Sequence, residues 1–246
     1  MISSKGILKM VVLSMLVALG VVISPILRFE GMCPMAHFIN IVCAVLLGPW
    51  YALLCATVIG IIRMALMGIP PLALTGAVFG AFLSGVFYKA SKGKLIFAVL
   101  GEVIGTGIIG ALVSVPVMKF LMGKEGISWF FYVPTFICGT LIGGSIAFVF
   151  LKKLAGGGML QRFQDMLGSA IYQYKSSHVE NSCTIAALGV ILFLVIKVLT
   201  VVTFPGNPNV KILPPVWSYI AYIVLALFIL AAVIYFFVKK KKVDAV

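Results

Sequence analysis

The 246-residue sequence has few charged residues, only 6 acids and only 2 histidines. Charged residues make up 10% of the chain, against about 25% in ordinary soluble domains. So few polar side chains could not cover a globular protein in water, which excludes a soluble fold and the disordered, collagen-like and disulfide-rich classes. The 5 cysteines are odd in number and form no C-x-x-C pair. This usage disfavours both a disulfide framework and a zinc site.

Several catalytic motifs are also missing. The sequence has no H-E-x-x-H, no G-x-S-x-G and no clustered pair of aspartates, so membrane proteases and hydrolases of those types are disfavoured and no enzyme activity, metal or cofactor is predicted. It also lacks G-x-x-x-x-G-K-[ST]. Any uptake driven by ATP would therefore need partner subunits that bind the nucleotide. A ladder of intramembrane acids is absent too, which makes an independent proton-coupled carrier less attractive.

Long apolar runs fill most of the chain. Hydrophobic residues make up 63% of it, and the mean hydropathy is +1.22. A membrane-spanning helix needs about 20 residues, and polar breaks separate eight apolar runs. We therefore predict an all-α integral membrane protein with eight spans, at 7–27, 36–47, 51–67, 72–88, 95–121, 130–151, 183–204 and 214–238.

The composition divides these spans into a bundle and an extension. Residues 1–153 hold six spans. Residues 154–182 form the longest polar stretch, predicted to be a cytoplasmic linker in which 159–174 have the spacing of a short interfacial helix. Residues 183–246 hold two more spans, separated by the turn sequence 205–209, and end in a lysine-rich tail.

The net charge is +13. In a soluble protein such an excess would suggest nucleic-acid binding, but in an apolar chain it more often reports orientation, because basic residues gather in cytoplasmic loops. If the spans alternate, most basic residues fall on the side of both termini. We therefore predict cytoplasmic termini in the cell membrane and no nucleic-acid partner. The residues on that side are Lys5, Lys9, Lys89, Lys92, Lys94, Lys152, Lys153, Arg162, Lys175 and Lys239 to Lys242.

Small residues recur four positions apart in several spans. Lipid gives no hydrophobic drive between helices, so close packing in membranes depends on such residues. Any single stripe is more often internal packing than a functional surface. The stripes are Ser14 and Ala18; Ala52, Ala56 and Gly60; Gly76, Gly80 and Ser84; Gly101 and Gly105; and Gly139, Gly143 and Ala147.

Polar side chains inside the predicted spans are the candidate site. His37 and Asn40 are three residues apart and share a helix face, and Arg63 is placed at a depth similar to that of Asn40. These three groups could converge on a pocket open to the outside, with Glu30 above it. The alternative is that Arg63 extends to the outer headgroups and His37 merely sits at the interface.

Glu102 and Thr106 follow one turn apart in the fifth predicted span. Counting the rise per residue puts Glu102 about 10 Å deeper than Arg63, so no direct ion pair is expected without helix tilting. Glu102 could contact a ligand, or it could be a structural carboxylate capped by hydroxyl groups. Trp129 and Tyr132 suit an aromatic belt at the membrane surface, and they could also stack on a ligand ring.

Four segments together resemble the ThiW family: His-Phe-Ile-Asn at 37–40, Leu-Gly-Pro-Trp-Tyr-Ala at 47–52, Ile-Gly-Ile-Ile-Arg at 59–63 and Gly-Glu-Val-Ile-Gly-Thr-Gly at 101–107. The resemblance covers about residues 5–153. It implies a six-helix S component, the substrate-binding membrane subunit of an energy-coupling factor (ECF) transporter. Such a subunit captures a thiamine precursor, here hydroxyethylthiazole, and works with a membrane coupling subunit and two ATPases. Ser14 and Ala18 match the small-residue pair that docks the coupling subunit.

The chain departs from the six-helix pattern after Lys153, where the linker and two extra spans follow. On the resemblance, His37, Asn40 and Arg63 bind a small heterocycle, and loop 28–35 closes over it. Two other functions stay open. One is a self-standing secondary carrier for a small metabolite, and the other is a membrane scaffold whose extension recruits other proteins.

Overall fold

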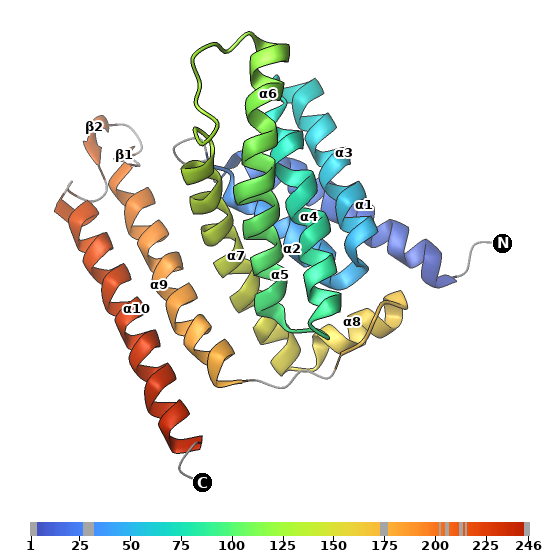
Figure 1. Cartoon of the computed structure of the whole chain (residues 1–246), viewed down its shortest axis with the longest axis vertical. Coiled ribbons are helices and arrows are strands. Elements are labelled where there is room, and N and C mark those ends of the chain that lie inside the picture. The colour runs from blue at the N-terminus through green and yellow to red at the C-terminus, as the bar shows by residue number, and fades with distance from the viewer. Residues whose placement is uncertain are drawn as a thin grey trace. The chain divides into compact units, whose positions relative to one another are not determined.

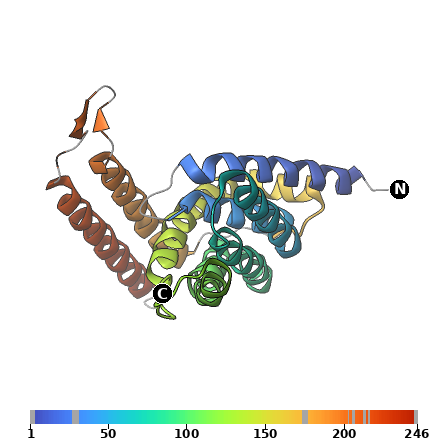
Figure 2. The same cartoon turned by 90° about the horizontal axis from the view of Figure 1, so that it is seen from above.

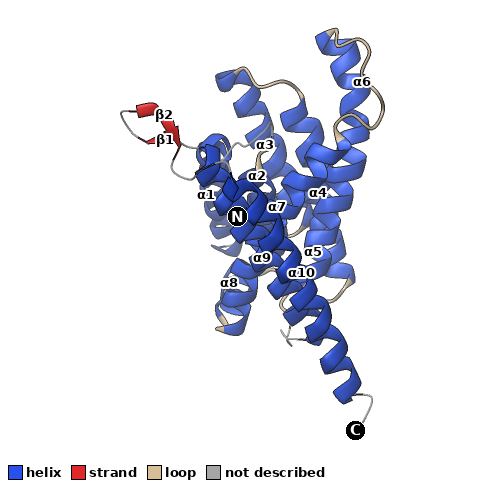
Figure 3. Ribbon diagram, turned by 90° about the vertical axis from the view of Figure 1, so that its left-hand side faces the viewer, coloured by secondary structure: helices blue, strands red, loops and turns tan. Residues whose placement is uncertain are grey.

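A computed structural model describes residues 4–26, 32–172, 177–201, 203–204, 207–211, 214 and 216–243. The chain divides into two compact units, residues 1–174 and 175–246, and each is described by itself. The described residues are helical apart from connecting segments and two short strands in the second unit (Figure 3). The predicted fold class, an all-α membrane protein, is confirmed.

The first unit is a bundle of apolar helices (Figure 1). Glycine and proline set several of the boundaries: α2 and α3 are joined by Gly48 alone, whose φ of 95° suits glycine, and Pro49 opens α3. The elements are α1 (Ser4–Ile26), α2 (Pro34–Leu47), α3 (Pro49–Met67), α4 (Leu72–Ala90), α5 (Leu95–Glu102), the π-helix η1 (Val103–Gly110), α6 (Ala111–Met122), α7 (Val133–Gly156) and α8 (Met159–Leu167).

Helix α2 is the buried centre of this unit. Of its 14 residues, 11 are buried. At 1.5 Å per residue the helix is about 21 Å long, whereas a bilayer core is about 30 Å thick. Among the described residues, seven other helical segments are long and apolar enough to cross a membrane, with α5, η1 and α6 counted as one. The second predicted span is therefore a short helix enclosed by other helices of the first unit.

Glycines bring α4 and the α5–η1 segment into backbone contact. A Cβ atom on Gly105 would lie 2.6 Å from the Cα atom of Gly80, and one on Gly110 would lie 2.9 Å from the Thr75 carbonyl oxygen. Gly101 likewise abuts the backbone at Leu83. The step from 105 to 110 is five residues, and the wider turn of the π-helix keeps both glycines on one face. The predicted stripe Gly76, Gly80 and Ser84 thus packs against the predicted stripe Gly101 and Gly105.

Helix α8 lies against the end of the unit that carries most of its basic residues, which we call the basic end. Gln164 is fully buried, and its Nε2 donates to the Val45 carbonyl oxygen (3.0 Å) and to the Tyr88 hydroxyl (3.2 Å). Lys5 and Lys9 of α1 donate to carbonyl oxygens at the C-terminal end of α8. Part of the stretch predicted as a linker therefore belongs to the first compact unit.

The second unit is a pair of long helices, α9 (His178–Val201) and α10 (Val216–Val243), which lie side by side (Figures 1 and 2). Gly189 packs against the Phe228 side chain, and Lys197 Nζ donates to Ser218 Oγ at 2.8 Å. Between the helices, where the sequence predicts only a turn, the antiparallel strands β1 (Thr203–Phe204) and β2 (Asn207–Lys211) pair.

The backbone contact at Gly105 gives a test of this packing. We expect Gly105→Ala to lower the thermal midpoint of the detergent-solubilised protein by several degrees, because a methyl group there meets backbone atoms that cannot move aside, at a cost of roughly 1–3 kcal/mol. Gly156→Ala is the matched control, since nothing lies within 4 Å of its Cβ position. Equal midpoints for the two variants would contradict the close α4–η1 contact.

Candidate ligand-binding site

A cavity of about 120 Å³ opens at the end of the first unit opposite the basic end. It lies among the start of α2, the α3–α4 connection, α4, η1 and the start of α7. Its walls are mostly apolar, with a few polar groups among them, as small-molecule sites usually are. The lining residues are Met32, Cys33, Ala36, His37, Arg63, Ile69, Pro70, Leu72, Ala73, Gly76, Ala77, Thr106, Thr135 and Phe136.

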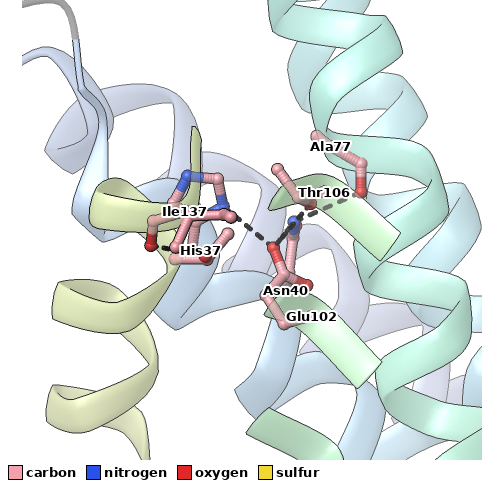
Figure 4. A network of polar contacts seen from close by, with 7 residues as sticks. His37, Asn40, Ala77, Glu102, Thr106 and Ile137 are labelled. Carbon is pink, nitrogen blue, oxygen red and sulfur yellow. Dashed lines mark hydrogen bonds and ion pairs between the residues drawn. The ribbon is translucent and has the colours of Figure 1, made fainter. Parts of the chain in front are cut away.

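Behind the cavity wall, a buried carboxylate joins α2 to the α5–η1 segment (Figure 4). Glu102 is fully buried, and its Oε1 accepts hydrogen bonds from His37 Nδ1 (2.9 Å), Asn40 Nδ2 (3.0 Å) and Thr106 Oγ1 (3.1 Å). Asn40 Nδ2 also donates to the Ala77 carbonyl oxygen at 3.4 Å, so both of its neighbours are acceptors. Three donors on one oxygen compensate for part of the cost of burying a carboxylate.

This arrangement places a hydrogen on Nδ1 of the His37 ring. An ionised Glu102 carboxylate can only accept hydrogen bonds, so His37 Nδ1, 2.9 Å from Oε1, carries the hydrogen and donates it. Nε2 is then the ring atom left for a ligand. In neutral imidazole it accepts a hydrogen bond, and in imidazolium it donates one. Glu102 thus orients His37 in the way that carboxylates orient histidine ligands at metal sites.

The second carboxylate oxygen of Glu102 lies against α4. Oε2 is buried and has no hydrogen-bond partner among the described residues. A Cβ atom on Gly80 would lie 2.7 Å from Oε2, and it would also collide with Thr106 Oγ1. The missing side chain at Gly80 therefore makes the space that the carboxylate and Thr106 occupy.

Arg63 supplies the positive charge of the cavity. The residue is 4% exposed, and one terminal amino group donates to Cys33 Sγ at 3.3 Å, while Nε is buried without a hydrogen-bond partner in the described chain. No carboxylate of the described residues forms an ion pair with it. A buried guanidinium with unused donor capacity favours a ligand that offers a hydrogen-bond acceptor.

Five of the predicted site residues lie at the cavity or directly behind it. His37, Arg63 and Thr106 line the cavity, and Asn40 and Glu102 lie directly behind it. Glu102 is not set apart from Asn40 by depth, as counting along the spans had implied, since the two side chains are hydrogen-bonded. Glu30, and residues 28–31 of the predicted closing loop, lie outside the described residues.

The structure places the two predicted aromatic residues outside the cavity lining. Tyr132 packs in a separate core cluster with Ala111, Val115 and Met118, and its ring is 5.9 Å from that of Phe136. Trp129 is 59% exposed. Residues near a helix start can face either the bundle or its surroundings, and their position in the sequence does not distinguish the two.

Sequence reasoning did not select Phe136 or Thr135 as lining residues, and it included Cys33 only as part of the closing loop 28–35. Phe136 is the aromatic wall of the cavity, and its ring lies where a side chain at Gly76 would be, 2.8 Å from that Cβ position. The predicted glycine stripe on α4 was interpreted as close helix packing, and at Gly76 the space it leaves is filled by the Phe136 ring. No group of three or more metal-ligating side chains occurs among the described residues.

A protein-family model matches more than half of the chain. The family model described as thiamine-precursor transporter protein (ThiW) matches residues 10–156, which agrees with the stretch over which the sequence resembles that family. The matched stretch includes every residue that lines the cavity. Comparisons with the curated proteins and with the solved structures return no match.

The carboxylate network makes a prediction for stability. We expect Glu102→Ala to lower the free energy of unfolding strongly, because His37 and Asn40 would be left as buried donors, at roughly 1–3 kcal/mol for each unpaired group. Glu102→Gln keeps the acceptor oxygen and should cost less. Thermal melts in detergent measure both, with the exposed Glu125→Ala as control. A midpoint for Glu102→Ala that equals that of Glu125→Ala would contradict the network.

Proposed function

The chain belongs to the ThiW family of thiamine-precursor transporter proteins, and from this membership we propose that it is the substrate-binding subunit of an ECF-type importer that captures hydroxyethylthiazole. It is a multi-pass membrane transporter and not an enzyme. The observation that carries the proposal is the cavity, in which a positioned imidazole and a buried guanidinium face mostly apolar walls.

The chemistry of the cavity suits a neutral thiazole alcohol. The ring nitrogen of the thiazole is an acceptor that Arg63 can serve, and its hydroxyl group is a donor for His37 Nε2. Phe136 and the apolar walls would contact the ring. Intact thiamine carries a permanent positive charge on the same ring. Placing that charge beside buried Arg63 is unfavourable, because like charges repel strongly where water is excluded.

The proposed import mechanism needs partners that bind ATP. Helix α1 offers a surface for them, since Ser14 and Ala18 are both exposed within the first unit. Large apolar side chains that surround this pair are also exposed: Met10, Val11, Met15, Leu19 and Val22. A small-residue pair on such a helix allows another membrane helix to approach closely. We assign this face to the coupling subunit, which would carry two ATPases.

Orientation follows from the basic end. Basic residues of cytoplasmic loops keep membrane proteins oriented, so the basic end would face the cytoplasm and the cavity would open outward. The residues of the first unit near that end are Lys5, Lys9, Lys89, Lys92, Lys94, Lys152, Lys153 and Arg162. Substrate would then enter the cavity from the extracellular side of the membrane.

Ligand preference tests the substrate. We expect the purified full chain to bind hydroxyethylthiazole saturably in calorimetry, and to bind thiamine at least about tenfold more weakly because of the repulsion by Arg63. The hydroxymethyl-pyrimidine precursor is the third ligand to compare. Binding of thiamine as tight as that of the thiazole, or tighter binding of the pyrimidine, would contradict the thiazole assignment.

Replacing Arg63 tests both of its proposed roles, which are binding of the thiazole and discrimination against thiamine. Arg63→Met should weaken thiazole binding about 10- to 100-fold, as expected for the loss of a charged donor, and should narrow the gap between thiazole and thiamine. Lys119→Met removes a charge that lies outside the cavity and serves as the control. If Arg63→Met lowers the affinities for thiazole and for thiamine by the same factor, Arg63 does not set the discrimination between them.

Blocking the α1 face tests the assembly. Replacing both Ser14 and Ala18 by leucine should abolish ATP-dependent uptake in cells that supply the coupling subunit and ATPases, while binding by the purified chain stays intact. Ala65→Leu, which adds one leucine at an exposed position of α3, is the control. Uptake that continues without any ATPase would instead favour a self-standing secondary carrier.

A further inference from the structure

A second cavity, of about 140 Å³, lies at the basic end of the first unit, away from the ligand cavity. It is formed by the first half of α1, the C-terminal ends of α2 and α4, and the segment that follows α8. No aspartate or glutamate is among its lining residues in the described chain. Those residues are Lys9, Ala44, Val45, Leu47, Gly48, Tyr88, Lys89, Gly168, Ser169, Ala170 and Tyr172.

Two ammonium groups face this cavity. Lys9 Nζ is held in place, because it donates to the Gly168 carbonyl oxygen at 3.3 Å and lies 5.6 Å from the centre of the Tyr51 ring. Lys89 lies in the last turn of α4, and its Nζ is 3.6 Å from the position that a Cβ atom on Gly48 would occupy. Within the described residues Lys89 has no carboxylate partner. The cavity therefore has positive charge on two of its walls.

A hydroxyl group adds an unused polar atom. Ser169 Oγ is buried and has no hydrogen-bond partner among the described residues. Its backbone is fixed, since Ser169 N donates to the Gln164 carbonyl oxygen at 2.8 Å in the turn that ends α8 at Gly168. A buried hydroxyl left unpaired is costly, and a bound ligand oxygen would satisfy it.

The rest of the wall is rigid. Tyr88 is 3% exposed and accepts a hydrogen bond from Gln164, and its ring packs edge-to-face on that of Tyr172 at 5.5 Å between centres. Gly48 has a φ of 95°, which side-chain-bearing residues rarely adopt. The backbone and the tyrosine wall of the cavity are thus constrained, and the exposed Lys89 side chain lies at its edge.

We infer that this cavity binds a phosphate group, carried either by an anionic phospholipid headgroup or by a soluble phosphorylated molecule. A phosphate offers several acceptor oxygens and negative charge, which match two ammonium groups and one hydroxyl donor. Basic pockets between membrane helices on the cytoplasmic side are suited to anionic headgroups. The inference concerns a different cavity from that of the proposed thiazole, so either can fail without the other.

Occupation of the site would affect how α8 is held. The cavity joins α1, α2 and α4 to the turn after α8, and a phosphate between Lys9, Lys89 and Ser169 would bridge these elements. The same α1 end already caps α8, since Lys5 donates to the Asp165 carbonyl oxygen. A bound anion would therefore strengthen the attachment of α8 to the bundle.

Charge-matched variants of the full chain test the inference. One double variant carries Lys9→Gln and Lys89→Gln, and the control carries Lys119→Gln and Lys124→Gln, which remove the same charge outside the cavity. Native mass spectrometry from mixed phosphatidylglycerol and phosphatidylcholine measures lipid preference. Calorimetry with glycerol 3-phosphate in neutral detergent measures the soluble source. We expect the Lys9 and Lys89 variant to lose roughly tenfold or more in affinity, and the control to keep it.

The outcomes separate the possibilities. A phosphatidylglycerol preference lost only in the Lys9 and Lys89 variant identifies a lipid headgroup, whereas saturable glycerol 3-phosphate binding lost in the same way identifies a soluble phosphate. Equal behaviour of the two double variants, or no binding of either probe, overturns the site. If the double variant does not fold, Lys89→Gln alone is compared with Lys124→Gln, because Lys89 makes no hydrogen bond to α8 among the described residues.

Discussion

The first unit depends on one buried carboxylate. Glu102 is fully buried, and its Oε1 gathers hydrogen bonds from His37 and Asn40 on α2 and from Thr106 on η1. An ionised carboxylate without such donors would be far too costly in an apolar interior. The requirement that these donors reach one oxygen therefore constrains where α2 and η1 lie. It also decides which nitrogen of His37 faces the cavity.

Close backbone packing makes room for this carboxylate. Gly80 leaves the space beside Oε2, and Gly105 lets η1 approach α4 at the same level. Membrane helices have no hydrophobic drive toward one another, so their association relies on such contacts and on interhelical hydrogen bonds. The glycine stripes and the polar network are thus parts of one arrangement. The π-helix η1 carries residues of both, because Gly105 faces α4 and Thr106 donates to Glu102.

Local patterns predicted most of the helices, the polar residues and the stripes, because each is encoded within one helix. The relative depth of residues on different helices was harder to predict from the sequence. Counting from the span ends placed Glu102 about 10 Å below Arg63, and so away from Asn40, yet Asn40 and Glu102 are 3.0 Å apart. The count assumed that every span starts at the same level. Helix α2 is short and enclosed, so His37 and Asn40 sit deeper than such a count allows.

That enclosed helix also joins the two ends of the unit. Near its start, His37 lines the ligand cavity, and near its end the Val45 carbonyl oxygen accepts a hydrogen bond from Gln164 of α8. Eight residues separate these positions, about 12 Å along the helix axis, and a helix of this length moves as a rigid rod. Any axial shift of α2 would therefore change the His37–Glu102 geometry and the seating of α8 together. Residues of α2 line both cavities, so one helix positions side chains at the two ends of the unit.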